Sequence, residues 1–572
     1  MSNFLMCFFL TSWAYCTCPD GNTLNIQYGV TTVNDYEYHQ CTKIQQVIFP
    51  ISIETIGEYS FSECSGLVKV ELPENVKSIG KSSFSYCNLL KSIVLPKYLT
   101  KIDDMSFFKC ESLLNITLPN TLTSIGDYAF SYCISLQNFK FPENLTYIGK
   151  HAFNFCLNLT ILHLNTAMTR IEDQSFYQCI YVKSLILPQN LISIGDFAFF
   201  DLNFLTTVEI PSSLRTIGDR AFSQCFALQK IEFYNSLTTI GSYLFANDRS
   251  LTEIILPYSL SYIGEAAFYY CSSLISIALF NNIHSIPNYA FSGCSSLVSV
   301  QLPYYLFEIG DYAFSDCYKL STLKYANNLV SIGECAFSGC SSLSSFDFPC
   351  TLSQISNSAF IYCQSLRSVT LPELITTVDD YSFYKCLELT NITLPQNLTS
   401  IGQFAFSGCD ALQNIIILTK NNISNQISQT AFYNSSSINT LIYKSAAFPI
   451  TPSWLNVKTI VFNSLELSSL PNLTNFSNLR NLFIYKTGEN FSIHNNHIIS
   501  DNITIEISNS ISQIEDFAFS KCDIFKFSYC GFNKLEGNYL RNAISCHNVI
   551  VSNDYKLESL GGLKITRYSK QC

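Results

Sequence analysis

Apolar and polar residues alternate along this chain in a pattern that repeats every 23 residues. Sixteen phenylalanines, from Phe61 to Phe406, follow this spacing without a slip. The copies from 44 to 411 share the pattern L-x-x-I-x-L-P-x-x-L-T-x-I-G-x-x-A-F-x-x-C-x-x, with Leu at position 1, Phe at position 18 and Cys at position 21. A fixed period of this size means that one supersecondary unit is copied and that each copy buries its apolar side against its neighbours. The pattern therefore predicts a solenoid.

The first half of each copy predicts a short strand. In the copy that begins at Leu113, Ile116 and Leu118 fall on one face and Thr117 on the other, as in a strand buried on one side. Proline follows the sixth position in twelve copies and ends the strand, because proline cannot donate to a ladder. Stacked strands of this kind predict a parallel sheet on the concave face of the solenoid.

The second half of each copy predicts a compact turn. The recurring glycine, as at Gly126, indicates a tight turn or a close backbone approach where a Cβ would not fit. The stretch D-Y-A-F-S-Y-C after it is too short for an independent α-helix. We therefore expect a 3₁₀ or single helical turn on the convex face, with Ala129, Phe130 and Cys133 turned inward.

The repeat resembles a known class. The stretch L-T-S-I-G-D-Y-A-F-S-Y-C at Leu122 to Cys133 is similar to the consensus of BspA-type leucine-rich repeats, and the resemblance covers 44–411 and returns at Ile511 to Cys522. It implies a leucine-rich repeat solenoid of the α/β horseshoe or arc type. It also implies display as a surface antigen or adhesin of a bacterium or parasitic protist, with binding to host proteins or cells.

The N-terminus departs from the repeat. Residues 1–14 predict a signal peptide, from an apolar run followed by small residues, although the positive charge that usually precedes such a run is missing. The alternative is an apolar cap segment in a cytosolic protein. Residues 15–43, with Cys16, Cys18 and Cys41, are interpreted as an N-terminal cap, because an open solenoid end exposes apolar core.

The C-terminal part, 412–572, predicts irregular repeats and a cap. Phe432 arrives three residues late, and apolar strands are expected at Leu441–Tyr443, Val457–Phe462 and Leu479–Ile484. No stretch near this end is apolar and long enough to span a bilayer or to act as a lipid-anchor signal, which predicts a secreted protein without a C-terminal anchor. The last 51 residues hold four cysteines, which suggests a disulfide-closed cap: Cys522, Cys530, Cys546 and Cys572.

Eleven N-x-S/T sequons predict a glycoprotein if the chain is secreted. Six of them fall after residue 411, where they suggest an exposed glycosylated segment. The candidate sites are Asn115, Asn144, Asn158, Asn391, Asn397, Asn422, Asn434, Asn472, Asn475, Asn490 and Asn502.

Charge and composition argue against nucleic acid as a partner. Lys and Arg number 33 and Asp and Glu 43, for a net charge of −10, and no basic run is present. Charged residues make up 13% of the chain, so the surface must be largely Ser, Thr, Asn, Gln and Tyr. Such a surface suits contact with protein or glycan.

The sequence offers no catalytic, cofactor-binding or metal-binding motif. Fourteen of the 24 cysteines occupy position 21, where a buried thiol acting as a small hydrophobe is expected and a disulfide between neighbouring coils is the alternative. His494 and His497 stand three residues apart, either as two ligands of a metal site or in a solvated loop. We therefore expect a protein that is not an enzyme.

The outward positions of the strands supply the candidate binding residues. Positions 3 and 5 between 161 and 255 mix apolar residues with charge, as a protein contact patch does, or as ordinary drift on a solvated sheet would. The candidates are Ile161, His163, Ile186, Glu209, Lys230, Glu232, Glu253 and Ile255. We expect an extracellular or cell-surface recognition or adhesion protein; an intracellular protein–protein interaction scaffold is the alternative.

Overall fold

The structure is a computed structural model, and it describes residues 18–137, 139–324, 328–420, 423, 425–445, 447–455, 457–464, 466–486, 491–494, 497–507, 513–531, 534–553 and 555–569. The chain forms two compact units, Met1–Asn282 (unit 1) and Ile283–Cys572 (unit 2), and each is described by itself. The expected signal peptide at 1–14 and the cysteines Cys16 and Cys572 lie outside the described residues.

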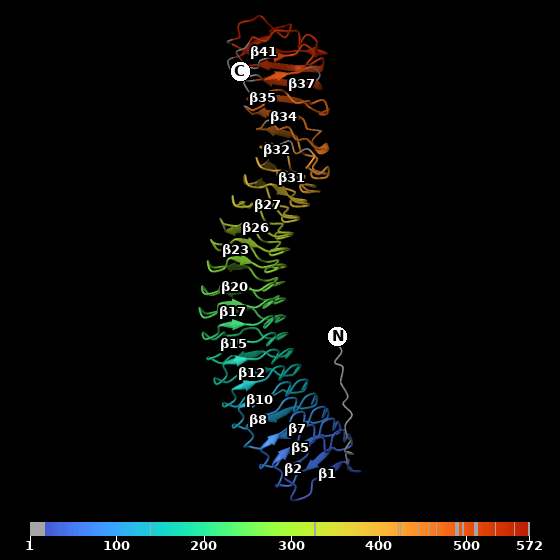
Figure 1. Cartoon of the computed structure of the whole chain (residues 1–572), viewed down its shortest axis with the longest axis vertical. Coiled ribbons are helices and arrows are strands. Elements are labelled where there is room, and N and C mark those ends of the chain that lie inside the picture. The colour runs from blue at the N-terminus through green and yellow to red at the C-terminus, as the bar shows by residue number, and fades with distance from the viewer. Residues whose placement is uncertain are drawn as a thin grey trace. The chain divides into compact units, whose positions relative to one another are not determined.

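Unit 1 carries a first ladder of three-residue strands at positions 3 to 5 of successive coils (Figure 1). The strands pair in parallel at a register of 23, so that Val70 lies beside Ile93 and Ile93 beside Ile116. The central residue of each strand is buried and confirms the expected alternation. The strands are β1 (Thr23–Asn25), β3 (Gln46–Ile48), β5 (Lys69–Glu71), β7 (Ser92–Val94), β9 (Asn115–Thr117), β12 (Ile161–His163), β14 (Ser184–Ile186), β17 (Lys230–Glu232), β19 (Glu253–Ile255) and β21 (Ser276–Ala278).

A second parallel ladder runs through positions 12 and 13 of unit 1, where a sheet was not expected. The isoleucine of position 13 is its buried residue, so Ile194 lies beside Ile217 and Ile217 beside Ile240. Its strands are β2 (Thr32–Val33), β4 (Thr55–Ile56), β6 (Ser78–Ile79), β8 (Lys101–Ile102), β10 (Ser124–Ile125), β11 (Tyr147–Ile148), β13 (Arg170–Ile171), β15 (Ser193–Ile194), β16 (Thr216–Ile217), β18 (Thr239–Ile240) and β20 (Tyr262–Ile263).

The phenylalanines of position 18 form a stacked column inside the coils. Phe222 is fully buried and lies between Phe199 and Phe245, with ring centroids 5.3 and 6.3 Å away. The rings of Phe61 and Phe84 are 5.4 Å apart and inclined by 6°. Parallel stacking at this distance adds to the burial of each ring. The column confirms that position 18 points inward.

The cysteines of position 21 form a column of buried thiols, as expected. These thiols donate hydrogen bonds to a carbonyl one coil earlier; the Cys133 Sγ lies 3.3 Å from the Phe107 oxygen and the Cys340 Sγ 3.2 Å from that of Phe314, while Cys64 donates to Tyr38. Burial raises the pKa of the Cys133 and Cys340 thiols well above its ordinary value, and that of Cys409 to about 12. Low thiolate content makes them unreactive.

Two coils of unit 1 lack this cysteine, and one has a carboxyl group in its place. Asp248 is fully buried, and its Oδ1 accepts a hydrogen bond of 2.8 Å from the Cys225 N–H. Its Oδ2 is buried without a hydrogen-bond partner among the described residues. Burial raises the pKa of Asp248 well above its ordinary value, because the charged form is disfavoured away from water.

The turn after the glycine is not the 3₁₀ or helical turn that the sequence predicts. Residues at positions 16 and 20 have positive φ, for example 54° at Tyr59 and 60° at Glu63. This left-handed geometry interrupts a right-handed helix. The N–H groups of positions 16, 18 and 20 donate instead to carbonyls one coil later, as from Tyr59 to Lys81, and Phe61 to Ser83. Hydrogen bonds between coils thus alternate with bonds inside the turn, such as that from the Ser62 N–H to the Tyr59 carbonyl, and no continuous helix forms.

The recurring glycine is required by the backbone of the preceding coil and, in several coils, also by an aspartate there. Asp104 Oδ1 accepts a hydrogen bond of 2.9 Å from the Asp127 N–H, and Asp127 accepts one of 2.8 Å from Lys150. A Cβ at Gly126 would lie 2.5 Å from Asp104 Oδ1 and 2.6 Å from its backbone nitrogen. The glycine therefore marks a close backbone approach, as predicted. Its φ is not positive, so backbone conformation is not the reason for glycine here.

The first coil begins earlier than the sequence pattern indicated. Strand β1 pairs with β3 at the usual register, and the Tyr38 ring stacks on Phe61 at 5.4 Å in the place of a phenylalanine. Cys18 and Cys41, also 23 residues apart, form a disulfide with Cα atoms 5.3 Å apart. The expected cap thus contains a coil of the repeat itself. A disulfide between neighbouring coils closes it, as in the alternative for the cysteines of position 21.

Unit 2 has two parallel ladders of the same kind, and the strands of its first ladder lengthen toward the end of the chain. Phe432, three residues late, still stacks on Phe406 at 5.1 Å. The three apolar strands expected after residue 412 are β33, β34 and β35, which pair in parallel with one another. The first ladder comprises β23 (Ser299–Gln301), β25 (Thr322–Lys324), β28 (Ser368–Thr370), β30 (Asn391–Leu394), β32 (Asn414–Ile417), β33 (Thr440–Tyr443), β34 (Thr459–Asn463), β35 (Asn481–Lys486), β37 (Ile499–Ile507), β39 (Lys521–Tyr529), β40 (Ser545–Cys546), β41 (Val549–Ser552) and β44 (Arg567–Ser569).

Short strands complete unit 2, and the one helical element in the described part of the chain is the 3₁₀ turn η1 (Pro452–Trp454). None of the described residues builds a helix that could cross a membrane. The second ladder and the closing hairpin comprise β22 (Ser285–Ile286), β24 (Glu308–Ile309), β26 (Ser331–Ile332), β27 (Gln354–Ile355), β29 (Thr377–Val378), β31 (Ser400–Ile401), β36 (Ser492–Ile493), β38 (Gln513–Ile514), β42 (Ser559–Leu560) and β43 (Leu563–Lys564).

The C-terminal cysteines are joined less than the sequence suggested. Cys530 is disulfide-bonded, whereas Cys522 is a buried thiol and Cys546 a half-buried one. No disulfide therefore forms among these three. Cys522 Sγ donates to the Ile498 carbonyl at 3.3 Å, as the thiols of the regular ladder do, because its coil repeats the same motif.

Candidate recognition surface

The outward side chains of the first ladder form a surface that we call the strand face. All eight residues proposed from the sequence as ligand contacts are exposed on it in unit 1, which confirms the predicted alternation but leaves their role in binding untested. The apolar ones stand out, because Ile161, Ile186 and Ile255 are 49%, 50% and 40% exposed. Exposed aliphatic side chains add nothing to the core. Single ones are common on protein surfaces, whereas a group of them marks an interaction site.

Strands β12 and β14 bring one apolar group of this surface together. Their register sets Ile161 beside Ser184 and His163 beside Ile186. His163 Nε2 lies 3.3 Å from the Ser184 hydroxyl, which links the two strands through their polar members. Adjacent parallel strands lie about 4.8 Å apart, so both isoleucines belong to one patch.

Strands β17 and β19 carry a second group with more charge. Lys230 lies beside Glu253, with Nζ 3.2 Å from Oε1, and Glu232 lies beside Ile255. The pair neutralises Lys230 and, being exposed, stabilises the fold by at most about 1 kcal/mol. Glu209, from the coil between the two groups, is also exposed. The surface is therefore apolar with an excess of carboxylate.

Two exposed tyrosines beside this surface escaped the sequence reasoning. Tyr234 follows β17 and is 50% exposed, and Tyr258 follows β19 and is 69% exposed. The Tyr258 ring packs on Phe280 with centroids 4.1 Å apart. A signal was present, because Tyr234 replaces the proline that usually ends the strand. Tyrosine is enriched in protein interfaces.

The opposite surface of unit 1, made by side chains at positions 16 and 20, is termed the turn face. Its aromatic and cationic residues contact one another: the Arg220 guanidinium lies 4.3 Å from the Tyr243 ring and 5.3 Å from that of Phe197. Tyr128 and His151 stack at 4.4 Å. Such contacts join neighbouring coils.

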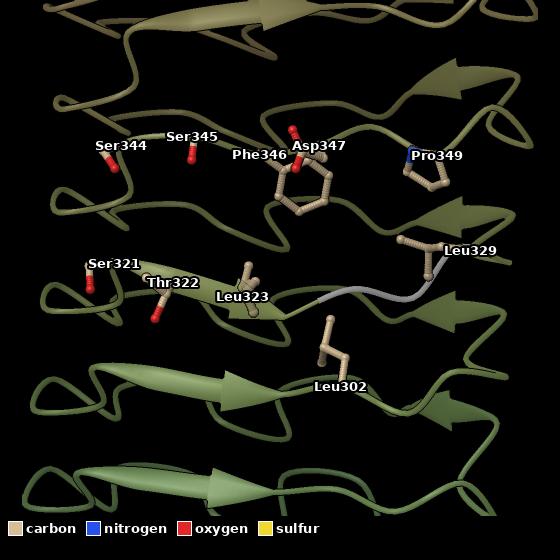
Figure 2. Close-up of a pocket in the computed structure, with 10 residues that line it drawn as sticks. All are labelled: Leu302, Ser321, Thr322, Leu323, Leu329, Ser344, Ser345, Phe346, Asp347 and Pro349. Atoms are coloured by element: carbon tan, nitrogen blue, oxygen red, sulfur yellow. The ribbon is translucent and has the colours of Figure 1, made fainter.

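Unit 2 contains a cavity of about 340 Å³ on its strand side, where residues 345–347 form no strand (Figure 2). Phe346 and Phe348 both turn into the core of this coil and pack on Phe360 at 5.0 and 5.3 Å. This coil, with two large inward rings, forms no strand of the first ladder. In unit 1 the coil with Phe139 and Phe141 has the same sequence pattern and also has no strand in its described residues.

The lining of the cavity is polar at one end and apolar at the other (Figure 2). Asp347 is its one ionisable residue, and the other polar groups of the lining are serine and threonine hydroxyls. The lining residues are Leu302, Ser321, Thr322, Leu323, Leu329, Ser344, Ser345, Phe346, Asp347 and Pro349.

His494 and His497 have separate partners. His494 Nδ1 lies 2.9 Å from Glu515 Oε1, and His497 Nδ1 lies 2.9 Å from the Leu470 carbonyl. Their rings are 5.6 Å apart. Among the residues that the structure describes, no group of three or more His, Cys, Asp or Glu is placed to hold a metal ion.

The candidate glycosylation sites occupy three kinds of position. Asn115 and Asn391 occupy position 3 of the repeat, at the start of strands β9 and β30, and are exposed on the strand side. Asn144 and Asn397, at position 9, donate through Nδ2 to a carbonyl of the preceding coil at 2.9 Å. Asn158 is half-buried, Asn422 and Asn490 lie outside the described residues, and the exposed remainder are Asn434, Asn472, Asn475 and Asn502.

The repeat is matched by a known family description. The BspA type leucine rich repeat region matches this chain in six overlapping copies, which cover residues 10–115, 100–225, 169–282, 193–321, 262–387 and 354–503. A surface protein of Trichomonas vaginalis, described as bspA-like, is 36% identical over 163 residues. That alignment takes in 26% of this chain and 26% of the relative, so the chain matches about a quarter of the relative's length.

Two solved bacterial structures are similar to this chain. A leucine-rich repeat protein from Bacteroides ovatus is 26% identical, with 74% of this chain and 91% of that one covered and a TM-score of 0.48. A leucine rich cell surface protein from Faecalibacterium prausnitzii is 28% identical, with coverage of 59% and 90% and a TM-score of 0.40. The repeat motif and the six family matches carry the assignment: this chain belongs to the family of BspA-type leucine-rich repeat proteins.

Proposed function

We propose that this protein is a non-enzymatic recognition protein of the cell surface or extracellular space, and that its strand face in unit 1 binds a protein on another cell or in a matrix. The observation that carries the proposal is the exposed patch of Ile161, Ile186 and Ile255 among carboxylates. Apolar residues rimmed by charge suit a protein contact.

Three further features support a surface location. Relatives from Trichomonas vaginalis and Faecalibacterium prausnitzii are described as surface proteins. The Cys18–Cys41 disulfide suits an oxidising compartment. The sequons suit passage through the secretory pathway.

The test is attachment of the fluorescently labelled full-length protein to intact epithelial cells. A variant with Ile186→Ser, Glu209→Ser and Glu232→Ser should lose at least tenfold in attachment while its unfolding midpoint stays the same. A control with Phe204→Ser and Glu265→Ser, which changes one exposed apolar and one acidic residue on the turns, should attach normally. Equal attachment of both variants would exclude the strand face as the binding surface.

A further inference from the structure

The sequons are distributed unevenly along the repeats. Three precede residue 159 and eight follow residue 390, and none lies between Asn158 and Asn391. Eleven asparagines occur within that interval, so asparagine itself has not been removed. What is missing is the serine or threonine two residues later.

Position 9 shows how closely the interval avoids the motif. Asn144-Leu145-Thr146, before the interval, is a sequon, whereas the equivalent Asn190 is followed at the same distance by Ile192. The Asn190 amide makes the same hydrogen bond to the preceding coil as Asn144 does, donating to the Thr166 carbonyl at 3.4 Å. The structure therefore explains why asparagine is retained here, and it does not require Ile192, which is exposed.

Strand position 3 shows the same contrast on the strand face itself. Asn115-Ile116-Thr117 on β9 is a sequon whose asparagine points outward, next to the coils that lead to β12. The corresponding triplets on β12, β14, β17 and β19 have none. An N-linked glycan is bulky and solubilising, so it would cover neighbouring strands. The eight candidate contacts all lie in the interval between Asn158 and Asn391; residues 1–114 of unit 1 also carry no sequon.

We propose that the strand face from β12 to β19 is kept free of N-linked glycans because it is the docking surface for a protein whose own contact surface is apolar and basic. This inference rests on the proposed function. The three exposed isoleucines offer no hydrogen bond to a sugar and favour an apolar protein surface. Lys230 is paired with Glu253, so Glu209 and Glu232 give the surface an acidic excess that lysine or arginine would complement.

The experiment places glycans by substitution in the full-length secreted protein, and measures attachment to intact epithelial cells with and without surface proteolysis. Ser184→Asn with Ile186→Thr creates a sequon in β14 at the register of Asn115. Ser184→Gln with Ile186→Thr is the matched variant without a sequon. Arg249→Thr creates a sequon at Asn247, on the turn face of the same unit.

The strand-face glycan should lower attachment at least tenfold relative to its matched variant, and enzymatic removal of the glycan should restore it. The turn-face glycan should have less than a twofold effect. Attachment should fall at 0.5 M salt and after surface proteolysis. Mass spectrometry of the parent should find glycan at Asn115 and Asn391.

Other results would overturn the inference in distinguishable ways. Normal attachment of the strand-face glycoprotein, with loss in the serine variant described above, would leave the proposed function standing and remove the glycan argument. Unoccupied Asn115 and Asn391 would do the same. Attachment that resists proteolysis would identify a glycan or lipid ligand and refute the protein partner.

Discussion

The two outer surfaces of unit 1 use their side chains in different ways. On the turn face, Arg220 stacks on Tyr243 and Phe197, and the aspartates behind it bond to the next coil. On the strand face, Ile186 and Glu209 are exposed and differ from the residues one coil away. Side chains of the turn face thus contact one another across coils, whereas Ile186 and Glu209 on the strand face are exposed to solvent. A solenoid can therefore change its partner without losing its stack.

The largest effect should come from the core that both surfaces share. Phe222→Ala removes a buried ring stacked between two others and should cost about 3–5 kcal/mol in the free energy of unfolding. Chemical denaturation followed by circular dichroism measures it. A cost below about 1 kcal/mol would place Phe222 outside the core.

The next effect should come from the close approach on the turn side. A Cβ at Gly218 would lie 2.6 Å from the Asp196 nitrogen and 2.7 Å from the Gly195 carbonyl carbon. Gly218→Ala should therefore cost about 1–3 kcal/mol of stability, as overpacking does. Gly21→Ala is the control, because nothing lies within 4 Å of a Cβ there. Equal stability of the two variants would contradict the close backbone approach at this glycine.

A third effect depends on pH and concerns Asp248. Burial raises the pKa of its carboxyl in the folded protein, so the unfolded chain releases the proton first, above about pH 4. Stability should fall as pH rises from there. Asp248→Cys, which restores the thiol column, should raise the unfolding midpoint at pH 7 and have little effect at pH 3.5. An equal gain at both pH values would mean that ionisation of Asp248 is not the cause.

The smallest effect should come from the strand face. Ile186→Ser, Glu209→Ser and Glu232→Ser should each change the free energy of unfolding by no more than about 0.5 kcal/mol, because these side chains are exposed. Differential scanning calorimetry tests this. A large loss would show that the strand face helps to hold the coils together. Arg220→Ser is the comparison on the turn face, and should cost more because Arg220 stacks on two rings.

The sequence predicted the core and the outward strand positions well, because both depend on simple periods. Phe222 and Cys225 recur every 23 residues, and alternation alone set Ile186 outward. The first coil was missed because Tyr38 stands where phenylalanine was sought. The left-handed residues of the turn were missed because their side chains vary from Tyr59 to Lys109, while their φ is set by hydrogen bonds to the next coil.

The candidate contacts depend on more than a period. Exposure of His163 or Glu232 follows from strand geometry, but the tyrosines after the strands lie in loops whose path the repeat does not fix. Tyr234 departs from the consensus at the position where proline usually ends the strand, and this departure is the sequence signal for an exposed contact residue there. Departures from a repeat are therefore as informative about a surface as the repeat is about the core.

The bonds from one turn to the next have an electrical consequence. The peptide group between Glu58 and Tyr59 accepts from the Tyr36 N–H and donates to the Lys81 carbonyl, and its equivalents continue the series to Glu265. Three such columns of peptide groups, at positions 16, 18 and 20, run through the coils of unit 1, and their hydrogen bonds all point in the same direction. Aligned peptide dipoles add up, as they do along an α-helix. Unit 1 thus has a dipole like that of an α-helix, directed along the stack of coils and not along the chain. Its carbonyls point outward at the first coil, and its N–H groups point outward at the last.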